Sequence, residues 1–211
     1  MPTILAPTPE NLGRAAACIR DGGLVVCPSD TNLAIALDPW NADAVKRAFA
    51  VKRRAATSPL TFFIEQPGHW RRYADSDDPA LVDRLAARFW PGPLNIVLRA
   101  RADVPRAALM GSSTISLGCL SNPTPRELIR QVGRAVAMTS ANLSGQADGV
   151  LVDLALATRQ IGDDVDLILE GGALNTTLSS TIVALSGAPA VLRHGDITAA
   201  DLAALLPALQ A

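Results

Sequence analysis

The sequence is poor in cysteine, histidine and aromatic residues, and each shortage excludes a class of protein. Its three cysteines, Cys18, Cys27 and Cys119, are scattered without a C-x-x-C pair, and the chain has two histidines. Zinc sites and disulfide frameworks need closely spaced ligands or paired cysteines, so neither is expected. Aromatic residues make up 4% of the chain, so alanine, leucine and valine must fill the core.

The chain also lacks a charge excess, a leader-like start and a long apolar run. Its formal net charge is −1 at pH 7, whereas a domain built mainly to bind nucleic acid usually carries a basic excess. Residues 1–28 have neither the basic start nor the continuous apolar core of a signal peptide. No apolar stretch is long enough to span a membrane. We therefore expect a cytoplasmic protein without membrane contact.

What the chain does have is enough apolar sequence to fold. Hydrophobic residues make up 49% of its 211 residues and charged residues 18%, a balance that excludes general disorder. A chain of this length can bury most of its apolar surface around one core. We expect a single domain over residues 1–211.

Helical and extended patterns alternate along the whole sequence. We expect helices over 9–19, 41–51, 79–89, 124–132, 151–161 and from about 198. We expect strands over 24–27, 34–37, 60–64, 95–98, 114–117, 135–138, 167–169, 181–185 and 190–192. Thr8 and Pro9 are typical of a helix start, and Thr124 with Glu127 has capping-box spacing. This alternation predicts an α/β fold with a mixed or mostly parallel sheet covered by helices.

A run of three cations, Lys52 to Arg54, stands just before the predicted strand 60–64. Alternate residues of an extended segment point the same way, so Lys52 and Arg54 can converge on one ligand while Arg53 faces outward. Lysine and arginine together suit a phosphate or a carboxylate. The alternative is that these cations are solvated at the C-terminal end of a helix, where positive charge interacts favourably with the helix dipole.

Three further polar clusters border predicted strands. Ser140, Asn142, Ser144 and Gly145 follow the strand 135–138, and small donors on flexible backbone there can approach an oxygen-rich ligand. This cluster is neither a Walker A loop nor a nucleophile elbow. The other two clusters are residues 28–31, and Ser180 with Arg193. Each has a plainer alternative, an ordinary turn or a surface arginine.

The clusters supply cations and hydroxyls but few candidate bases. No histidine, cysteine or acidic pair has the spacing of a covalent triad. Such a set favours catalysis by positioning and by neutralising phosphate charge, as in nucleotidyl transfer with Mg²⁺.

Six motifs in order resemble the YrdC-like family, which includes the threonylcarbamoyl-adenylate synthases of tRNA modification. The likeness extends from about residue 15 to 197. The motifs lie at 23–31, Lys52-x-Arg54 with Pro59-Leu60, 89–94, 140–145, 180–183 and Arg193-x-Gly195. The resemblance implies a YrdC/RibB-like fold, a twisted mixed parallel and antiparallel sheet flanked by helices around a positively charged cavity.

The resemblance also implies a reaction and a set of residues. Typical members combine ATP, bicarbonate and L-threonine into threonylcarbamoyl-AMP and release pyrophosphate, with Mg²⁺ accompanying ATP and no metal ligand assigned to the protein. The catalytic tetrad carries over to Lys52, Arg54, Ser140 and Asn142. The other nucleotide-binding residues carry over to Thr31, Pro59, Ser144, Ser180 and Arg193. The substrate-binding residues carry over to Ser29, Thr31, Leu33, Thr114, Ser116, Gly118 and Ser180.

The departures from the family pattern lie on the amino-acid side. Residues 32–35 read Asn-Leu-Ala-Ile where members usually have Val-Tyr-Gly-Leu, so Leu33 replaces a tyrosine. Gly118 stands where members carry an arginine, Asn95 where they carry a threonine, and Ala184 where they carry an aspartate. The phosphate side is kept, whereas the amino-acid side is altered.

Three alternatives therefore stay open. The first is a YrdC-like enzyme with a different carbamoyl or acyl acceptor. The second is a double-stranded RNA-binding or ribosome-binding module without catalysis, and its candidate basic residues are Arg71, Arg72, Arg99 and Arg101. The third is a nucleotide-binding or hydrolysing relative with another substrate. For the enzyme alternatives, a contact with tRNA stays open as well. The sequence does not define an oligomeric state.

Overall fold

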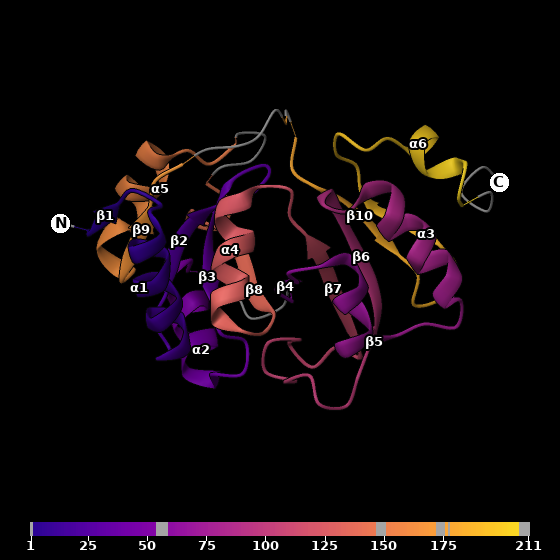
Figure 1. Ribbon diagram of the computed structural model, residues 1–211, viewed down its shortest axis with the longest axis horizontal. Helices are drawn as coiled ribbons and strands as arrows, with labels where there is room; N and C mark the ends of the chain where they lie inside the picture. The colour runs from indigo at the N-terminus through magenta and orange to yellow at the C-terminus, as the bar shows by residue number, and fades with distance from the viewer. Residues whose placement is uncertain (1, 54–58, 147–150, 172–175, 177, 207–211) are drawn as a thin grey trace.

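A computed structural model of the chain describes residues 2–53, 59–146, 151–171, 176 and 178–206. Within these residues the strands join one sheet in the order β1-β9-β2-β3-β8-β4-β7-β6-β10-β11, with β5 beside β6 (Figure 1). The strands are β1 Ile4–Leu5, β2 Val25–Pro28, β3 Leu33–Leu37, β4 Thr61–Phe63, β5 Ala74–Asp75, β6 Gly92–Ala100, β7 Thr114–Cys119, β8 Val136–Ser140, β9 Leu167–Leu169, β10 Thr181–Ala184 and β11 Ala190–Arg193. The helices are α1 Pro9–Arg20, α2 Ala42–Val51, α3 Pro79–Phe89, α4 Pro123–Val132, α5 Leu154–Ile161 and α6 Ala199–Ala203, with 3₁₀ turns η1 Pro67–Arg72 and η2 Gly162–Asp164.

The sheet is mixed, as the sequence predicts. Parallel pairing joins β9 to both β1 and β2, β4 to β7, and β6 to β10. The remaining neighbours are antiparallel, including β2 with β3 and β3 with β8. The predicted α/β sheet flanked by helices is confirmed.

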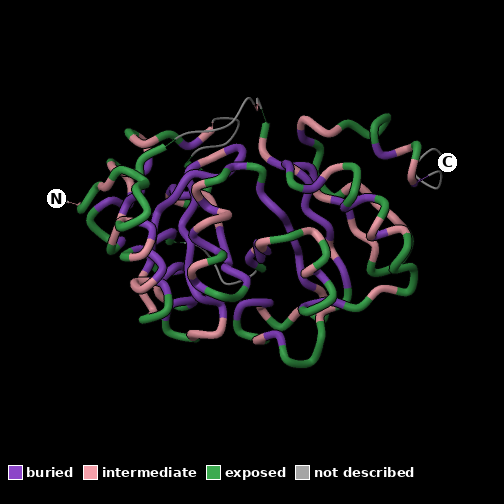
Figure 2. Tube along the Cα trace, viewed as in Figure 1, coloured by how far each residue is buried: buried purple, intermediate pink, exposed green. Residues whose placement is uncertain are grey.

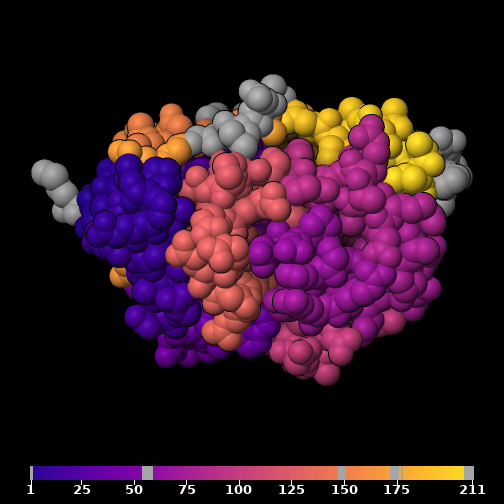
Figure 3. Space-filling view, in the orientation of Figure 1, coloured from indigo at the N-terminus to yellow at the C-terminus, as the bar shows by residue number. Residues whose placement is uncertain are grey.

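Alternation along β3 separates the two faces of the sheet. Leu33, Ile35 and Leu37 belong to one buried cluster, with residues of α2, α3 and α5, whereas Ala34 and Ala36 belong to a second. The second cluster contains the buried faces of α1 and α4. The small alanine side chains of this cluster let α1 and α4 lie close to the sheet. The two helices lie side by side, and their surfaces are neighbours in Figure 3. Figure 2 shows the buried strands enclosed by exposed helix faces.

The first helix begins as predicted, but the start of α4 is different. Thr8 caps α1, and its hydroxyl accepts the Asn11 amide at 3.3 Å. The predicted capping box of Thr124 and Glu127 is wrong, because Asn122 caps α4 and accepts the Thr124 amide at 3.1 Å. Pro123 fits the first helical position, where an amide hydrogen is not needed. The Glu127 carboxylate instead accepts from the Arg130 guanidinium and the Gln131 amide.

The predicted helix over 151–161 starts later than expected, at Leu154. Asp153 is its cap and accepts the Leu156 amide at 2.7 Å. Val152 lies instead along the start of β3, where its carbonyl accepts the Leu33 amide at 2.9 Å. The short strands β1 and β5 and the turn η1 were not predicted. In the part of the chain described here, no helix is both long and apolar enough to cross a membrane.

Candidate functional site

A cavity of about 610 Å³ opens on the face of the sheet that also carries α1 and α4. Its walls come from the β2–β3 turn and from strands β3, β4, β6, β7, β8, β10 and β11. A volume of this size is typical of small-molecule sites, which span roughly 300–1,000 Å³. The cavity therefore collects residues from Ser29 to Arg193, almost the whole length of the chain.

Lys52 is the buried cation of this cavity. It caps the C-terminal end of α2, the residue is 3% exposed, and it lines the cavity. Its ammonium group donates to the Asn142 carbonyl at 2.8 Å, to the Ser140 hydroxyl at 3.3 Å and to the Ser140 carbonyl. The structure thus brings together Lys52, Ser140 and Asn142, which the sequence placed at one site.

The extended segment predicted from Lys52 is wrong at its first two residues, because Lys52 has helical backbone at the end of α2 and Arg53 follows it in a turn. Arg53 is exposed and has a left-handed backbone, with φ at 48°. Pro59 lines the cavity. Arg54, the second cation of the predicted tetrad, lies outside the described residues.

The segment after β8 is bound to α2 through main chain as well as side chain. The Ser144 amide donates to the Lys52 carbonyl at 2.9 Å, and the Asn142 carboxamide donates to the Leu143 carbonyl at 2.7 Å. Gln160 of α5 accepts the Leu143 amide at 2.9 Å. These bonds hold Ser140, Asn142 and Ser144 at the wall of the cavity.

The β2–β3 turn forms the neighbouring wall. The Ser29 hydroxyl accepts the amides of Thr31 and Asn32 at 3.2 and 3.0 Å and donates to the Asn32 carbonyl at 2.7 Å. The Asn32 carboxamide donates to the Thr31 hydroxyl at 3.2 Å and to Ser179 at 3.4 Å. Since Ser29 and Asn32 shape the turn, Thr31 reaches the cavity in a fixed backbone conformation.

Asp30 of the same turn points to the protein interior instead. It is 1% exposed, and its carboxylate accepts the backbone amides of Ser121 and Asn122 at 2.8–2.9 Å. The Asn122 side chain returns a bond to the Ser29 carbonyl at 3.1 Å. Asp30 thereby joins the turn to the start of α4.

Ser180 and Arg193 form the far wall. Arg193 donates through Nε to the Ser180 carbonyl at 2.8 Å, and both residues line the cavity. Although Arg193 as a whole is exposed, nearby groups desolvate its guanidinium and lower the pKa of this group. Among the residues that the structure describes, none accepts from its other two nitrogens, which can therefore bind an anionic ligand in the cavity.

The floor of the cavity is uncharged. Thr61 donates to Ser116 at 3.3 Å across β4 and β7, and Asn95 of β6 lies beside them. Phe63 contributes an aromatic ring. This floor therefore offers hydroxyl, amide and aromatic groups.

Three predicted substrate residues do not line the cavity. Leu33 is 1% exposed and points into the core on the opposite face, because it alternates with Ala34. Thr114 begins β7, and its hydroxyl lies 2.8 Å from that of Ser112. Gly118 lies beneath its strand neighbours Asn95 and Phe63. Their roles stay predictions from the family resemblance.

Several cavity residues were not singled out from the sequence as binding residues. They are Asn32, Thr61, Phe63, Asn95, Ser179 and Leu192. Asn32 and Asn95 are departures from the family pattern, which is a signal that could have found them. Thr61 and Phe63 carry no such signal, because only strand pairing brings them beside Ser116 and Gly118.

The described lining residues include two cations, many hydroxyls and amides, and no carboxylate, histidine or cysteine. Such a site can bind an anion and stabilise negative charge, but it offers few proton acceptors. No group of three or more His, Cys, Asp and Glu side chains suited to a metal ion occurs within the described ranges. A divalent cation here would therefore depend mainly on oxygens that its ligand brings.

Comparisons with known proteins agree with this geometry. The family model Sua5_yciO_yrdC, described as "Telomere recombination", matches residues 17–195. A threonylcarbamoyl-AMP synthase of Pyrococcus abyssi (strain GE5 / Orsay) is 31% identical over 182 residues, covering 84% of this chain. A putative threonylcarbamoyl-AMP synthase of Mycobacterium tuberculosis is 32% identical over 195 residues, covering 91% of this chain and 87% of that protein.

Similarity extends to a solved structure. P. abyssi Sua5 complexed with L-threonine matches with a TM-score of 0.88 at 28% identity, covering 97% of this chain and 59% of that chain. The chain spans about half the length of the P. abyssi synthase, since the match covers 52% of that protein.

Proposed function

The chain belongs to the Sua5/YciO/YrdC family, and we propose that it is an ATP-dependent nucleotidyltransferase that forms a carbamoyl-type adenylate. The product we propose is L-threonylcarbamoyl-AMP, made from ATP, bicarbonate and L-threonine with release of pyrophosphate. This adenylate would supply the modification of tRNA, and a cytoplasmic location is part of the same proposal. The relatives named as threonylcarbamoyl-AMP synthases support the activity. The match to Sua5 in complex with L-threonine supports the acceptor.

The reaction has two bond-forming steps. The threonine amine attacks bicarbonate, and water leaves to give a carbamate. A carbamate oxygen then attacks the α-phosphorus of ATP while the bond from that phosphorus to pyrophosphate breaks. Positioning is the main requirement of such a transfer, because phosphoryl chemistry needs little covalent help from the protein.

The residues of the cavity would divide this work. Lys52 would offset the charge that develops on the α-phosphate, since its buried ammonium already faces oxygen atoms at 2.8 and 3.3 Å. Ser140 and Asn142 would hold phosphate or carbamate oxygens. Ser180 and Arg193 would bind phosphates on the opposite wall, and Arg54 would complete the cationic set. Thr31, Pro59 and Ser144 would line the nucleotide, whereas Ser29 and Ser116 would contact the acceptor.

Mg²⁺ fits this proposal as a companion of ATP. The described lining residues supply neutral oxygens and no carboxylate, so ATP phosphates and water would provide most of its ligands. The ion would neutralise phosphate charge when bound, and the hydroxyls of Ser140 and Ser144 are neutral oxygens of the cavity lining that would be available to it.

One observation carries the proposal: the buried Lys52 ammonium bound to the Ser140–Asn142 segment at the wall of a 610 Å³ cavity. The test is mass spectrometry of products after incubation with ATP, Mg²⁺, bicarbonate and L-threonine. We expect a threonylcarbamoyl adduct of AMP and an equal amount of pyrophosphate. A product set without any carbamoyl or acyl adenylate, across a pool of all common amino acids, would reject the activity. An adduct with another amino acid alone would support the alternative acceptor.

The alternative as an RNA-binding module is less well supported by the charges. Arg71, Arg99 and Arg101 all form ion pairs, with nitrogen–oxygen distances of 2.5, 3.1 and 3.2 Å. Their partners are Asp83, Asp77 and Asp75, respectively. Paired arginines offer less positive potential to a phosphate backbone.

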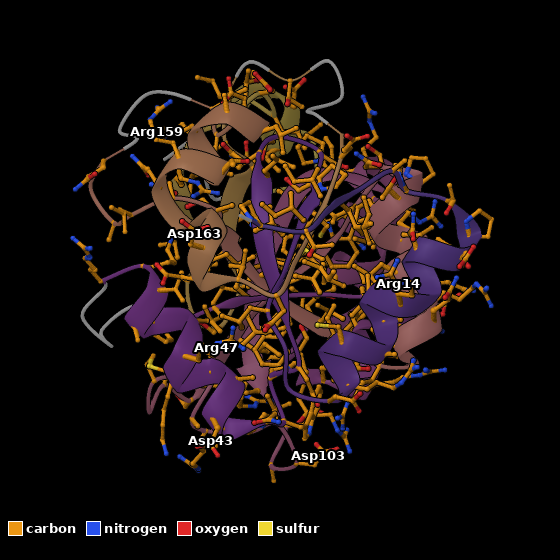
Figure 4. The ribbon with its side chains drawn as sticks, turned by 90° about the vertical axis from the view of Figure 1, so that its left-hand side faces the viewer. Arg14, Asp43, Arg47, Asp103, Arg159 and Asp163 are labelled. Carbon is orange, nitrogen blue, oxygen red and sulfur yellow. The ribbon has the colours of Figure 1, made fainter. Side chains whose placement is uncertain are left out.

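The face shown in Figure 4 also mixes both signs of charge. Its labelled side chains include both acids and arginines, and Arg47 pairs with Asp166 at 2.7 Å. The labelled residues there are Arg14, Asp43, Arg47, Asp103, Arg159 and Asp163. RNA binding that weakens steeply with salt, without nucleotide turnover, would favour the module over the enzyme.

A further inference from the structure

Asn95 is a buried polar side chain without a protein partner in the described structure. It is 4% exposed, lies in β6 and lines the cavity. No residue that the structure describes forms a hydrogen bond with its carboxamide. Within the described residues, the fully buried side-chain polar atoms without a partner are Arg126 Nε and Thr158 Oγ1, so the Asn95 carboxamide faces the open cavity, where a ligand group can reach it.

The position of this carboxamide is determined by its neighbours. Phe63, Gly118 and Asn95 form a row across β4, β7 and β6. A Cβ atom built on Gly118 would lie 2.6 Å from both the Asn95 Oδ1 atom and the Phe63 Cε1 atom. Only glycine at 118 leaves the two side chains room, so the ring and the amide lie together over Gly118. Gly118 thus leaves the space in which the Asn95 amide faces the cavity.

The surroundings determine which ligand group fits. Thr61, Phe63 and Ser116 on the floor are uncharged, whereas the cations Lys52 and Arg193 lie on the walls. Strand register sets Asn95 opposite Ile182 of β10 and Ile182 opposite Arg193 of β11, so the carboxylate of an acceptor can face the Arg193 side while its side chain faces Phe63. A neutral hydroxyl can donate to Oδ1 or accept from Nδ2 of the carboxamide, and carbon atoms next to it can contact the Phe63 ring.

We infer that Asn95 is a specificity-determining residue that binds the side-chain hydroxyl of the acceptor amino acid. This inference rests on the proposed function and assigns the residue of this chain that selects an acceptor with a β-hydroxyl group. The amino and carboxylate groups of the acceptor then face the walls, where the cations and the phosphates of ATP lie. Valine, which has a methyl group in place of the threonine hydroxyl, leaves the amide unpaired and is rejected.

The test compares threonine with valine in the wild type and in Asn95→Leu, a change of similar volume that removes the amide. We expect the wild type to prefer threonine in kcat/KM by about 100-fold or more. In N95L this preference falls at least about tenfold, as for the loss of a hydrogen bond to a desolvated partner, while the KM for ATP stays within about twofold. Asn95→Ser, which keeps a hydroxyl, retains part of the preference. Thermal melting of both variants establishes that they are folded.

Two outcomes would overturn the inference while leaving the enzyme activity standing. One is an N95L variant with an unchanged threonine-to-valine ratio. The other is a variant with raised KM for ATP and an unchanged ratio, which would assign Asn95 to the nucleotide.

Failure of the proposed function is distinguishable from both. If the wild type forms no adduct with any amino acid, calorimetric titration of threonine and of valine in the presence of a non-hydrolysable ATP analogue replaces the kinetics. Tighter binding of threonine by the wild type and loss of that difference in N95L would support the role of Asn95. Equal binding of the two amino acids, or binding of neither, would reject it.

Discussion

Lys52 illustrates how one side chain can serve both structure and chemistry. Its ammonium group satisfies the carbonyls of Ser140 and Asn142 and lines the cavity at the same time. We expect Lys52→Met to lower kcat of adenylate formation by about 100-fold or more, in the range seen on loss of a charge-stabilising donor. The neighbouring, exposed Arg53 supplies a matched control, because Arg53→Ala removes a cation that faces away from the site. Activity of K52M above a tenth of the wild-type rate would contradict the role of Lys52.

The three cysteine side chains differ in the reactivity that we expect of them. Burial raises the pKa of the Cys27 and Cys119 thiols to about 12, and it also raises the pKa of the half-buried Cys18, where Asp166 adds to the effect. Thiolates are the reactive form, so at pH 8 the native protein should react slowly, and at Cys18 first. Iodoacetamide labelling with peptide mass spectrometry measures this, and unfolding in urea should expose all three thiols. Rapid labelling of Cys27 in the folded protein would show that its burial is incomplete.

Motifs at this scale name residues, but they do not show which face of a strand a side chain occupies. Lys52, Ser140 and Asn142 were assigned to one site from their motifs, and they meet. Leu33 was assigned to the substrate from the same kind of argument, yet the alternation of β3 turns it into the opposite core. Asn95 became a candidate only after the register of β6 with β7 placed it over Gly118.

Helix α4 shows what determines the limits of an element. It ends at Gly133, which has a left-handed backbone with φ at 85°, and a Cβ there would meet no atom within 4 Å. Gly133→Ala should therefore cost only the backbone penalty of about 1–2 kcal/mol, measurable by urea unfolding. Gly68→Ala is the matched control, since a Cβ at 68 also meets nothing but the backbone there has no positive φ. Equal stabilities of the two variants would contradict this explanation.

The Asp30 carboxylate joins two elements, the β2–β3 turn and the start of α4, by hydrogen bonds. Removal of the Asp30 carboxylate leaves the buried amides of Ser121 and Asn122 without their acceptor. We expect Asp30→Ala to lower the free energy of unfolding by about 2–4 kcal/mol, and to raise the KM for substrate because Ser29 and Thr31 lose their support. The exposed Asp21 gives the control, D21A, which should stay close to wild type. A stable D30A protein with unchanged KM would leave Asp30 without this role.

Local patterns predict whether a segment forms a helix or a strand. The first and last residues of several elements, however, depend on contacts with residues far away in the sequence. Thr124 and Glu127 have the spacing of a capping box, but α4 begins one residue earlier, at Pro123, and Asn122 is its cap. Residues 151–153 have helical composition, but Val152 donates to the Asn32 side-chain oxygen and accepts from the Leu33 amide, which joins it to the start of β3. Such contacts cannot be read from a window of neighbouring residues.

At the scale of the whole molecule, a ligand of the cavity should stabilise the fold. ATP at a concentration 100 times its Kd adds about 2.7 kcal/mol by linkage, provided that the unfolded chain does not bind it. For a chain of this size that corresponds to a rise in Tm of about 5–10 °C. Differential scanning fluorimetry with ATP and Mg²⁺ measures the shift, which should be lost in K52M and kept in R53A. A shift of equal size in K52M would place the nucleotide elsewhere.

Strand order is the part of the fold that the sequence could not supply. The helices and most strands follow from periodicity, whereas the pairing of Ala34 with Ser140 joins positions 106 residues apart. The family resemblance provided the mixed sheet, and the alanines of α1 and β3 explain only why α1 can lie close to the sheet. The cavity depends on this order, because its walls are residues that strand pairing brings together.

The strand order, in which strands from late in the sequence lie between earlier ones, has a consequence during synthesis on the ribosome. Strand β8 lies between β3 and β4, and β9 lies between β1 and β2, although both emerge later than their neighbours. Until residues 136–140 have left the ribosome, the facing edges of β3 and β4 have no partner in this sheet, and open edges invite pairing with other chains. The nascent protein is therefore most prone to aggregation during the middle of its translation, when the hairpin of β2 and β3 already exists but its closing strand does not.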